Sequence, residues 1–253
     1  MKKSSPKRKI FTRSKTSGRI SLTDPTYMSF LSAFLALSGT TILTVLASFS
    51  DIAKKNTYLR QALVSESCVN IVAGLTYSLF LKYLYEEHLT LDGVTPLRYL
   101  DWAITTPLLL FSFTLYVQYF NVGTRTTPVD FLPLIYIVVL NFAMLFFGYL
   151  GETTGRNQIL YFVLGFGAYA GLFYFLYDKY VDGKDNTILT YYIIFAVVWG
   201  LYGLAYLLPI QWKNIVYNIL DVISKAGFGI LIWISMIQED PQLTMESPLT
   251  FTI

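Results

Sequence analysis

The sequence predicts an all-α fold, a bundle of seven transmembrane helices. Only 14% of the 253 residues are charged and 54% are hydrophobic, whereas a typical soluble domain has about 25% charged residues. The mean hydropathy of +0.50 agrees with a membrane protein. A single Cys excludes an intrachain disulfide framework, and a single His excludes a multi-histidine metal site. We therefore expect no metal centre.

Seven apolar segments follow one another along the chain from Tyr27 onward. Each has about 20 residues or more, which is enough to cross roughly 30 Å of hydrocarbon at a rise of 1.5 Å per residue. In order, the predicted spans lie near residues 27–49, 60–84, 96–119, 130–150, 158–178, 188–209 and 214–237.

Polar, turn-forming residues separate these spans. Apart from the turn at 92–95 the connections are short, which predicts that consecutive helices are antiparallel neighbours in one bundle. Tyr and Trp are frequent at the span ends, as the aromatic belts of a membrane interface require. The breaks, in order, are Asp51 to Asn56, Asp92-Gly93, Thr126-Thr127-Pro128, Gly151 to Asn157, Asp182 to Asn186 and Pro209.

The seven-helix membrane domain is predicted over residues 27–238, between two tails. Residues 1–26 form a basic tail, because 8 of the 19 Lys and Arg lie within the first 19 residues. Such a charge run is typical of disorder, and it favours attraction to anionic lipid headgroups over nucleic-acid binding. The tail has no apolar run of signal-peptide length. Residues 239–253 form a short C-terminal tail.

Five charged side chains fall inside the predicted spans, where charge is costly and marks candidate functional residues. Glu66 lies in the second span. Arg98 and Asp101 share one face of the third span, and Asp221 and Lys225 share one face of the seventh. Two cations and two anions could thus neutralise one another in the bundle core. The structural alternative is an ion-pair network that only orients helices, although buried pairs often fail to stabilise relative to apolar substitutes.

Lys225 is the most informative of these residues, because it lies in the middle of its span, too deep to snorkel easily. Desolvation favours the neutral, nucleophilic amine, which suits Schiff-base formation with an aldehyde. The product would be a covalently held, protonatable imine that needs an anionic partner.

At this point the sequence resembles the microbial (type 1) rhodopsins over roughly residues 27–237. The string RYLDWAITTPLLL at 98–110 is the most diagnostic of that family, and DVISK at 221–225 matches its Asp-x-x-x-Lys retinal-binding element. WGLYGLAY at 199–206 matches its Trp-x-x-Tyr pocket wall, with Gly203 in place of the usual Pro. MLFFGYLGE at 144–152 is close to the proteorhodopsin branch.

The resemblance implies a role for each buried charge. All-trans-retinal would bind covalently to Lys225. Asp101 would be the primary counterion and proton acceptor, and Asp221 the second counterion. Arg98 would lie on the extracellular side of this cluster, and Thr105 would hydrogen-bond Asp101.

The resemblance also implies the cofactor pocket. Tyr77 and Tyr202 would hydrogen-bond the second counterion, and an apolar Leu109 suggests green rather than blue absorption. The implied pocket residues are Trp102, Thr106, Leu109, Met144, Gly148, Trp199, Tyr202 and Tyr206, with Phe162 and Gly165 added from the fifth span and Tyr77 counted among the cofactor-binding residues.

The third span carries an Asp-Thr-Ser pattern at Asp101, Thr105 and Ser112, which resembles the rhodopsins of giant viruses of marine protists. Proton pumps of the family usually carry Asp or Glu as proton donor where Ser112 stands. Glu66 is the candidate replacement, because it lies eleven residues before Tyr77 and so falls at about the depth of Ser112. The alternatives are that Glu66 faces a wet funnel, or that water supplies the proton slowly.

The predicted function is therefore a light-driven outward proton pump, which is an ion transporter and not an enzyme. Asp101 argues against halide pumps, which need a neutral residue there, and against sodium pumps, which use Asn. A light-gated cation channel stays open because the usual donor is missing. A sensory photoreceptor stays open because a slow cycle would suit signalling. A structural or lipid-binding protein would require Lys225 to be idle.

The resemblance implies a multi-pass protein of the plasma membrane with an extracellular N-terminus. Charge counting opposes this orientation, because eleven Lys and Arg lie on the side of the N-terminal tail and six on the other. We follow the family, since long polar tails can translocate despite their charge. The expected partners are the bilayer, protons and further copies of the chain in a trimer or pentamer, with no nucleic acid.

Overall fold

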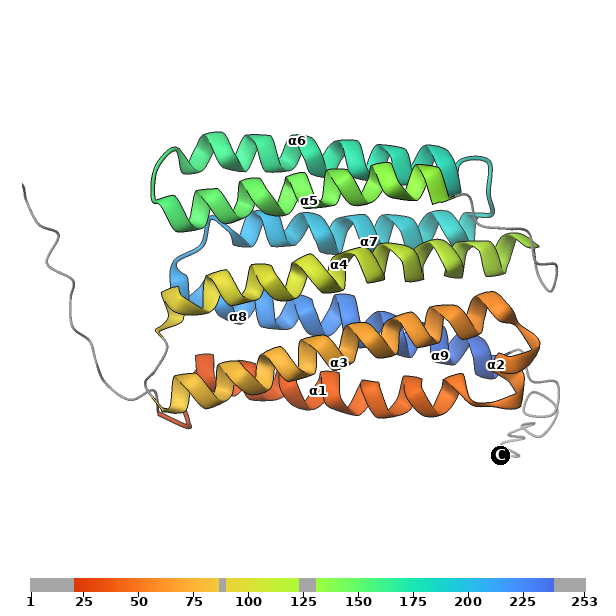
Figure 1. Ribbon diagram of the computed structural model, residues 1–253, viewed down its shortest axis with the longest axis horizontal. Coiled ribbons are helices and arrows are strands. Elements are labelled where there is room, and N and C mark those ends of the chain that lie inside the picture. Colours follow the sequence, from red (N-terminus) through yellow and green to blue (C-terminus); the bar gives the residue numbers. More distant parts are fainter. Residues whose placement is uncertain (1–20, 87–89, 123–130, 239–253) are drawn as a thin grey trace, which may run out of the picture.

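Seven long helices run up and down in a single bundle, as the sequence predicts (Figure 1). The structure is a computed structural model that describes residues 21–86, 90–122 and 131–238. Within these residues, seven helical stretches are long and apolar enough to cross a bilayer. The prediction of an all-α, seven-helix membrane fold is confirmed, and the protein is an integral multi-pass membrane protein.

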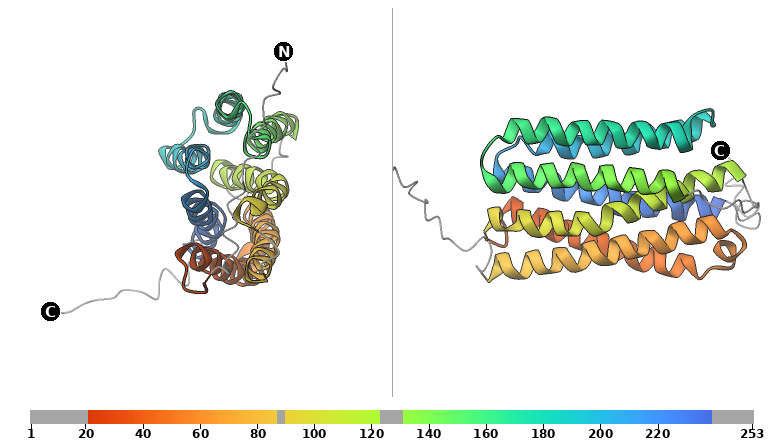
Figure 2. Two further views of the ribbon diagram at one scale, coloured as in Figure 1. Left: turned by 90° about the vertical axis from the view of Figure 1, so that its left-hand side faces the viewer. Right: turned by 45° about the horizontal axis from the view of Figure 1, so that its top comes forward.

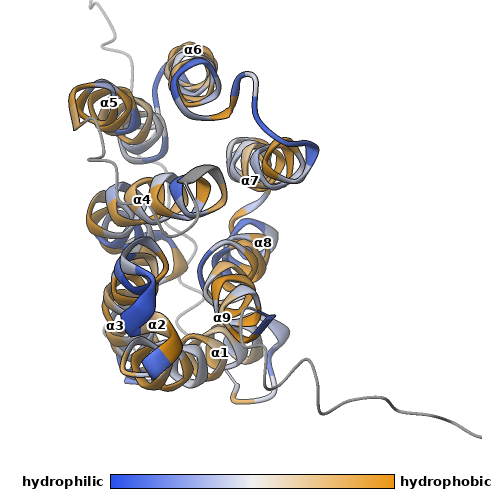
Figure 3. Cartoon of the chain, turned by 90° about the vertical axis from the view of Figure 1, so that its right-hand side faces the viewer, coloured by the Kyte–Doolittle hydropathy of each residue, from blue (hydrophilic) through white to orange (hydrophobic). Residues whose placement is uncertain are grey.

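The spanning helices form a ring in chain order, with the last beside the first (Figures 2 and 3). A short helix, α2 (Asp51–Lys55), lies between the first two. The spanning elements are α1 (Pro25–Ser48), α3 (Thr57–Tyr85), α4 (Leu91–Val122), α5 (Phe131–Thr154), α6 (Gln158–Leu176) with the π-helical η1 (Tyr177–Val181), α7 (Asn186–Ala205), and the seventh span of α8 (Ile210–Asp221), the π-helical η2 (Val222–Gly227) and α9 (Phe228–Gln238).

Two predicted breaks differ from the structure. Asp92 and Gly93 lie in the first turn of α4, because Thr90 Oγ1 accepts the Gly93 backbone N–H and an acidic residue suits a helix N-terminus. The prediction of a turn at Asp92-Gly93 is therefore wrong. The break at 51–56 contains α2, which Ser50 caps by accepting the Ala53 N–H. The Thr126 to Pro128 turn, most of the predicted N-terminal tail and all of the predicted C-terminal tail lie outside the described residues.

The other described breaks are present where turn chemistry predicts them. Gly183 has a φ of +70°, a backbone conformation that glycine adopts without strain. Asp185 caps α7 by accepting the Thr187 backbone N–H, and this hydrogen bond lowers the pKa of the Asp185 carboxyl. Pro209 stands directly before α8.

Burial is uneven around the ring. In α3, α4 and the seventh span 56–61% of the spanning residues are buried, against 17–22% in α5, α6 and α7. The exposed faces of the latter helices carry large apolar residues such as Phe146, Ile159 and Val197, which suit contact with lipid. The polar core therefore lies among α3, α4 and the seventh span, where the candidate residues stand.

The seventh span packs closely against α1 and α3 at Gly229. A Cβ added there would lie 3.1 Å from Thr40 Cγ2 and 3.2 Å from Thr44 Cγ2. Gly229→Val should lower the free energy of unfolding by about 1–3 kcal/mol, because overpacking forces neighbouring helices apart. Denaturation in detergent measures this loss. Gly167→Val on α6 is the control, because an added Cβ there meets no described atom within 4 Å. Equal losses in both variants would contradict the account.

Candidate functional site

Four buried charges meet at the centre of the bundle. Lys225 Nζ lies 2.6 Å from Asp101 Oδ2 and 3.5 Å from Asp221 Oδ1, and the three side chains are at most 1% exposed. Arg98 Nη1 lies 3.4 Å from Asp221 Oδ2. The predicted cluster of two cations and two anions is therefore present. Lys225 reaches it from η2, a widened helical turn of a kind that is frequent at functional sites.

The two carboxylates have different surroundings. Asp221 Oδ1 accepts hydrogen bonds from Trp102 Nε1 at 3.2 Å and from the Tyr202 hydroxyl at 2.7 Å. The Tyr77 hydroxyl donates to Asp221 Oδ2 at 2.8 Å. Asp101, in contrast, receives Lys225 at Oδ2, and its Oδ1 has no hydrogen-bond partner among the described residues. Asp101 is thus the carboxylate with a free acceptor atom beside the amine.

Thr105 hydrogen-bonds Asp101, as the resemblance implies. Its hydroxyl donates at 3.0 Å to the backbone carbonyl of Asp101, one turn earlier on α4. This bond within the helix is available to any Thr at this spacing, and Asp101 Oδ1 has no hydrogen-bond partner among the described residues.

Arg98 is held on the side of the cluster nearer the start of α8. Its Nη2 donates to Asn218 Oδ1 at 2.7 Å and to Asn214 Oδ1 at 3.2 Å. The guanidinium also lies 5.4–5.6 Å from the centroids of four rings, within cation–π range. These rings belong to Phe30, Tyr77, Phe80 and Tyr217. The cation is therefore fixed by amides and rings as well as by Asp221.

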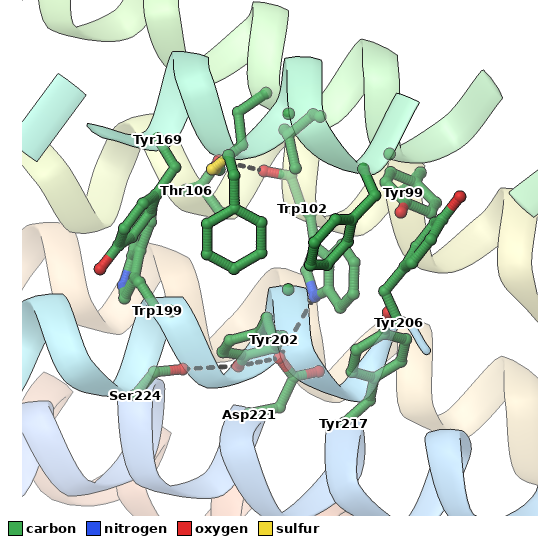
Figure 4. Close-up of a pocket in the computed structure, with 18 of the residues that line it drawn as sticks. Tyr99, Trp102, Thr106, Tyr169, Trp199, Tyr202, Tyr206, Tyr217, Asp221 and Ser224 are labelled. Atoms are coloured by element: carbon green, nitrogen blue, oxygen red, sulfur yellow. Dashed lines mark hydrogen bonds between the residues drawn. The ribbon is translucent and has the colours of Figure 1, made fainter. Parts of the chain in front are cut away.

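A cavity with about 780 Å³ of empty space adjoins Lys225, walled by α4, α5, α6 and α7. Trp102 and Tyr202 reach from opposite walls toward Asp221 (Figure 4). All ten residues predicted to line the pocket from the third to sixth spans do line it. They are Trp102, Thr106, Leu109, Met144, Gly148, Phe162, Gly165, Trp199, Tyr202 and Tyr206. Tyr77 does not, because it contacts Asp221 from α3 instead.

The sequence analysis missed other residues of the wall. Phe166 and Tyr169 share the α6 face of Phe162 and Gly165, so helical spacing alone could have found them. Gly203 stands where the family has Pro, and a Cβ at that position would collide with the Phe166 ring. The Phe166 ring of α6 therefore occupies the space that a side chain at position 203 would need. The remaining missed wall residues are Tyr99, Leu145, Tyr161, Gly200, Tyr217 and Ser224.

Glu66 lies apart from the charge cluster, toward the end of the bundle where α3 begins. Its side chain is fully buried, and neither carboxyl oxygen has a hydrogen-bond partner in the part of the chain that the structure describes. The Ser112 hydroxyl donates at 3.3 Å to the Ala62 carbonyl, one turn before Glu66, so the two residues lie at similar depth as predicted. Full burial disagrees with the alternative of a wet funnel at Glu66.

Comparison with known proteins points to one family. The chain matches the model of the family described as bacteriorhodopsin-like protein over residues 26–239. It is 27% identical to the green-light absorbing proteorhodopsin of Gamma-proteobacterium EBAC31A08, over 88% of this chain and 90% of that one. It is 26% identical to sensory rhodopsin-2 of Haloarcula vallismortis, over 57% of this chain and 64% of that one.

The fold comparison agrees. The crystal structure of viral rhodopsin OLPVRII superposes with a TM-score of 0.77 at 33% identity, over 85% of this chain and 99% of that chain. The similarity to a viral rhodopsin and to proteorhodopsin supports the resemblance that the third-span pattern predicts.

Removal of Arg98 should destabilise the protein strongly. Arg98→Met would leave Asp221 buried without this cation, which typically costs about 3–5 kcal/mol. Unfolding by denaturant in detergent, without retinal, measures the loss. The control is Lys54→Met, which breaks the exposed pair between Lys54 and Asp51 and should change the unfolding free energy little. A similar small change in both variants would contradict the structural role given to Arg98.

Proposed function

Because the chain belongs to the family of bacteriorhodopsin-like proteins, we propose that it is a light-driven pump that moves protons outward across the plasma membrane. Members of this family are light-driven transporters or photoreceptors that bind retinal through a lysine Schiff base. One observation carries the proposal: Asp101 Oδ2 lies 2.6 Å from Lys225 Nζ while Oδ1 has no hydrogen-bond partner among the described residues. A proton leaving Nζ has an adjacent acceptor.

The cavity beside Lys225 supports all-trans-retinal as the cofactor. Small-molecule sites are usually lined by apolar and aromatic side chains with a few polar groups, and this cavity has such a lining. Aromatic side chains such as Trp102 and Trp199 form much of its wall, and the buried Lys225 amine is available at one side. When bound there as an imine, retinal supplies light absorption and a nitrogen whose proton is easier to lose after isomerisation.

The protein side chains determine where the proton goes. Asp101 accepts it from Lys225 Nζ, because the contact of Nζ with Asp101 Oδ2 is the shortest in the cluster and fewer described donors stabilise the Asp101 carboxylate than that of Asp221. Asp221 keeps its negative charge, because Tyr77, Tyr202 and other donors stabilise the ionised form. The charge on Asp221 then balances Arg98 while Asp101 is neutral.

Glu66 returns a proton to Lys225 Nζ from the other side of the cluster. Full burial favours the neutral form of a carboxyl, so Glu66 can carry a proton at rest. Ser112 cannot take this role, since a hydroxyl does not give up a proton at physiological pH. With Glu66 at one end of the path and Asp101 with Arg98 at the other, transport runs from the α2 end of the bundle toward the start of α8.

A sensory photoreceptor is the second candidate, because the serine at position 112 suits a slow cycle and sensory rhodopsin-2 is among the relatives. A light-gated channel has less support. Three buried phenylalanine rings pack together in the apolar core, with centroids 4.7 Å apart between Phe113 and Phe195 and 5.8 Å apart between Phe195 and Phe228. Such close packing leaves little room there for a continuous water-filled path.

Membrane orientation, tail function and assembly are proposed by analogy with the family. We propose an extracellular N-terminus, a basic tail over residues 1–26 that contacts anionic lipid headgroups, a membrane domain over 27–238, a C-terminal tail over 239–253, and assembly into a trimer or pentamer.

Light-induced pH change in retinal-fed cells tests the function. Illumination of an unbuffered suspension should acidify the medium, and a protonophore should abolish the change. Asp101→Asn should abolish net transport and shift absorption to the red, because the negative charge beside the imine is lost. Lys225→Ala should be colourless. Protonophore-sensitive alkalinisation would instead mean inward flow, and coloured cells without a pH change would favour the sensory receptor.

Glu66→Gln should slow the return of the proton to Lys225 Nζ, because an amide cannot donate it. Flash photolysis measures this step as the decay of the blue-shifted, deprotonated state, with an expected slowing of about tenfold or more. Unchanged decay would show that Glu66 is not the donor.

Ser112→Asp provides the matched rescue of this variant. Because Ser112 and Glu66 lie at similar depth, the double variant Glu66→Gln with Ser112→Asp should recover fast decay. If the double variant decays as slowly as Glu66→Gln alone, a carboxyl at position 112 cannot replace Glu66. That result would contradict the idea that depth in the bundle is what allows Glu66 to donate.

A further inference from the structure

A partly buried ion pair lies outside the charge cluster, between the end of α5 and the start of α8. Lys213 Nζ lies 3.0 Å from Glu152 Oε2, and the two side chains are 14% and 4% exposed. Lys213 falls between the predicted spans 188–209 and 214–237, and Glu152 follows the predicted span 130–150. Because taking such charges out of water is costly, their partners are informative.

The Glu152–Lys213 pair contacts three tyrosines of the cavity wall. Glu152 Oε1 accepts hydrogen bonds from the Tyr99 and Tyr217 hydroxyls, each at 3.1 Å. Lys213 Nζ lies 5.3 Å from the centroid of the Tyr206 ring, within cation–π range. The three tyrosines gather at one end of the cavity, opposite Tyr169 and Trp199 (Figure 4). The ion pair therefore holds the tyrosine side chains at that end of the cavity in place, from the side that faces away from the cavity.

The other side of the pair faces water. Glu152 and Lys213 line a polar hollow together with Asp92, Thr153 and Gln158, all three of which are exposed. The Tyr206 hydroxyl donates at 3.2 Å to the backbone carbonyl of Gln158 at the same hollow. The ion pair and its tyrosines are thus what separates this hollow from the apolar cavity.

Two glycines on α5 leave room for the tyrosine hydroxyls. Gly148 and Gly151 leave the space that two hydroxyls occupy, since a Cβ on Gly148 would lie 2.6 Å from Tyr99 Oη and one on Gly151 would collide with Tyr206 Oη. No side chain of these glycines can fill the gap if the tyrosines move. Closure at this end therefore depends on the hydrogen bonds and the cation that hold the rings.

We propose that the Glu152–Lys213 pair is a seal that keeps water and small polar solutes of the hollow away from the cavity and from the Lys225 imine. Glu152 and Lys213 are positioning residues that act through Tyr99, Tyr206 and Tyr217. The inference rests on the proposed function, in that the cavity holds retinal on Lys225.

Hydroxylamine in the dark is the probe of the seal. Its nitrogen adds to the imine carbon, the bond from that carbon to Lys225 Nζ breaks, and the oxime leaves while the two hydrogens of the hydroxylamine nitrogen pass to Nζ. Loss of visible absorption measures the rate. Glu152→Ala and Lys213→Met should each bleach about tenfold faster or more, because they remove charge-assisted hydrogen bonds that hold the wall closed.

Two controls separate a seal from general loosening. Lys213→Arg keeps the pair and should bleach at the wild-type rate. Gly229→Val loosens the bundle away from the seal and should bleach more slowly than either seal variant at equal loss of thermal stability. Bleaching that simply follows thermal stability across all variants, or unchanged bleaching in both seal variants, would overturn the seal.

The experiment distinguishes failure of the proposed function from failure of the seal. A wild-type chain that forms no pigment with retinal would refute retinal binding at Lys225, with which the seal would fall as well. A wild-type pigment with unaltered hydroxylamine sensitivity in the seal variants would refute the seal alone.

Discussion

The contact between Lys225 and Asp101 is the interaction on which the rest of the site depends. An amine and a carboxylate that are each about 1% exposed hold each other's charge at 2.6 Å in a region where a lone charge would be costly. Asp221 and Arg98 complete the neutral group, whose four members come from α4 and the seventh span. Helix α3 contributes Tyr77, which hydrogen-bonds Asp221. These three spans have the largest shares of buried residues.

Chemical asymmetry follows from unequal hydrogen bonding. Asp221 is surrounded by donors, among them Tyr77 and Tyr202, while Asp101 has one oxygen without a described partner. Glu66 lies nearer the start of α3, about half of the hydrocarbon thickness away from the cluster, because the eleven helical steps from Glu66 to Tyr77 span about 16 Å. An acceptor and a candidate donor on opposite sides of one amine are the minimum that directional proton transfer requires.

Motifs within single helices could be predicted from the sequence, because helical spacing determines which residues share a face. This holds for Asp221 with Lys225. The Glu152 contacts could not be found in this way, since they join residues 53, 61 and 65 positions apart on three helices. Turn chemistry was ambiguous at Asp92, because residues that favour turns also favour helix starts. The spacing of Thr105 and Asp101 predicts their hydrogen bond but does not tell which Asp101 oxygen accepts it, and the structure shows that the backbone carbonyl does.

Time-resolved infrared difference spectroscopy of the retinal-loaded protein tests the central claim most directly. Loss of the proton from Lys225 Nζ should coincide with the appearance of a protonated-carboxyl C=O band that is absent in Asp101→Asn. A band that persists in Asp101→Asn and disappears in Asp221→Asn, or deprotonation of Nζ with no carboxyl band at all, would contradict Asp101 as the proton acceptor.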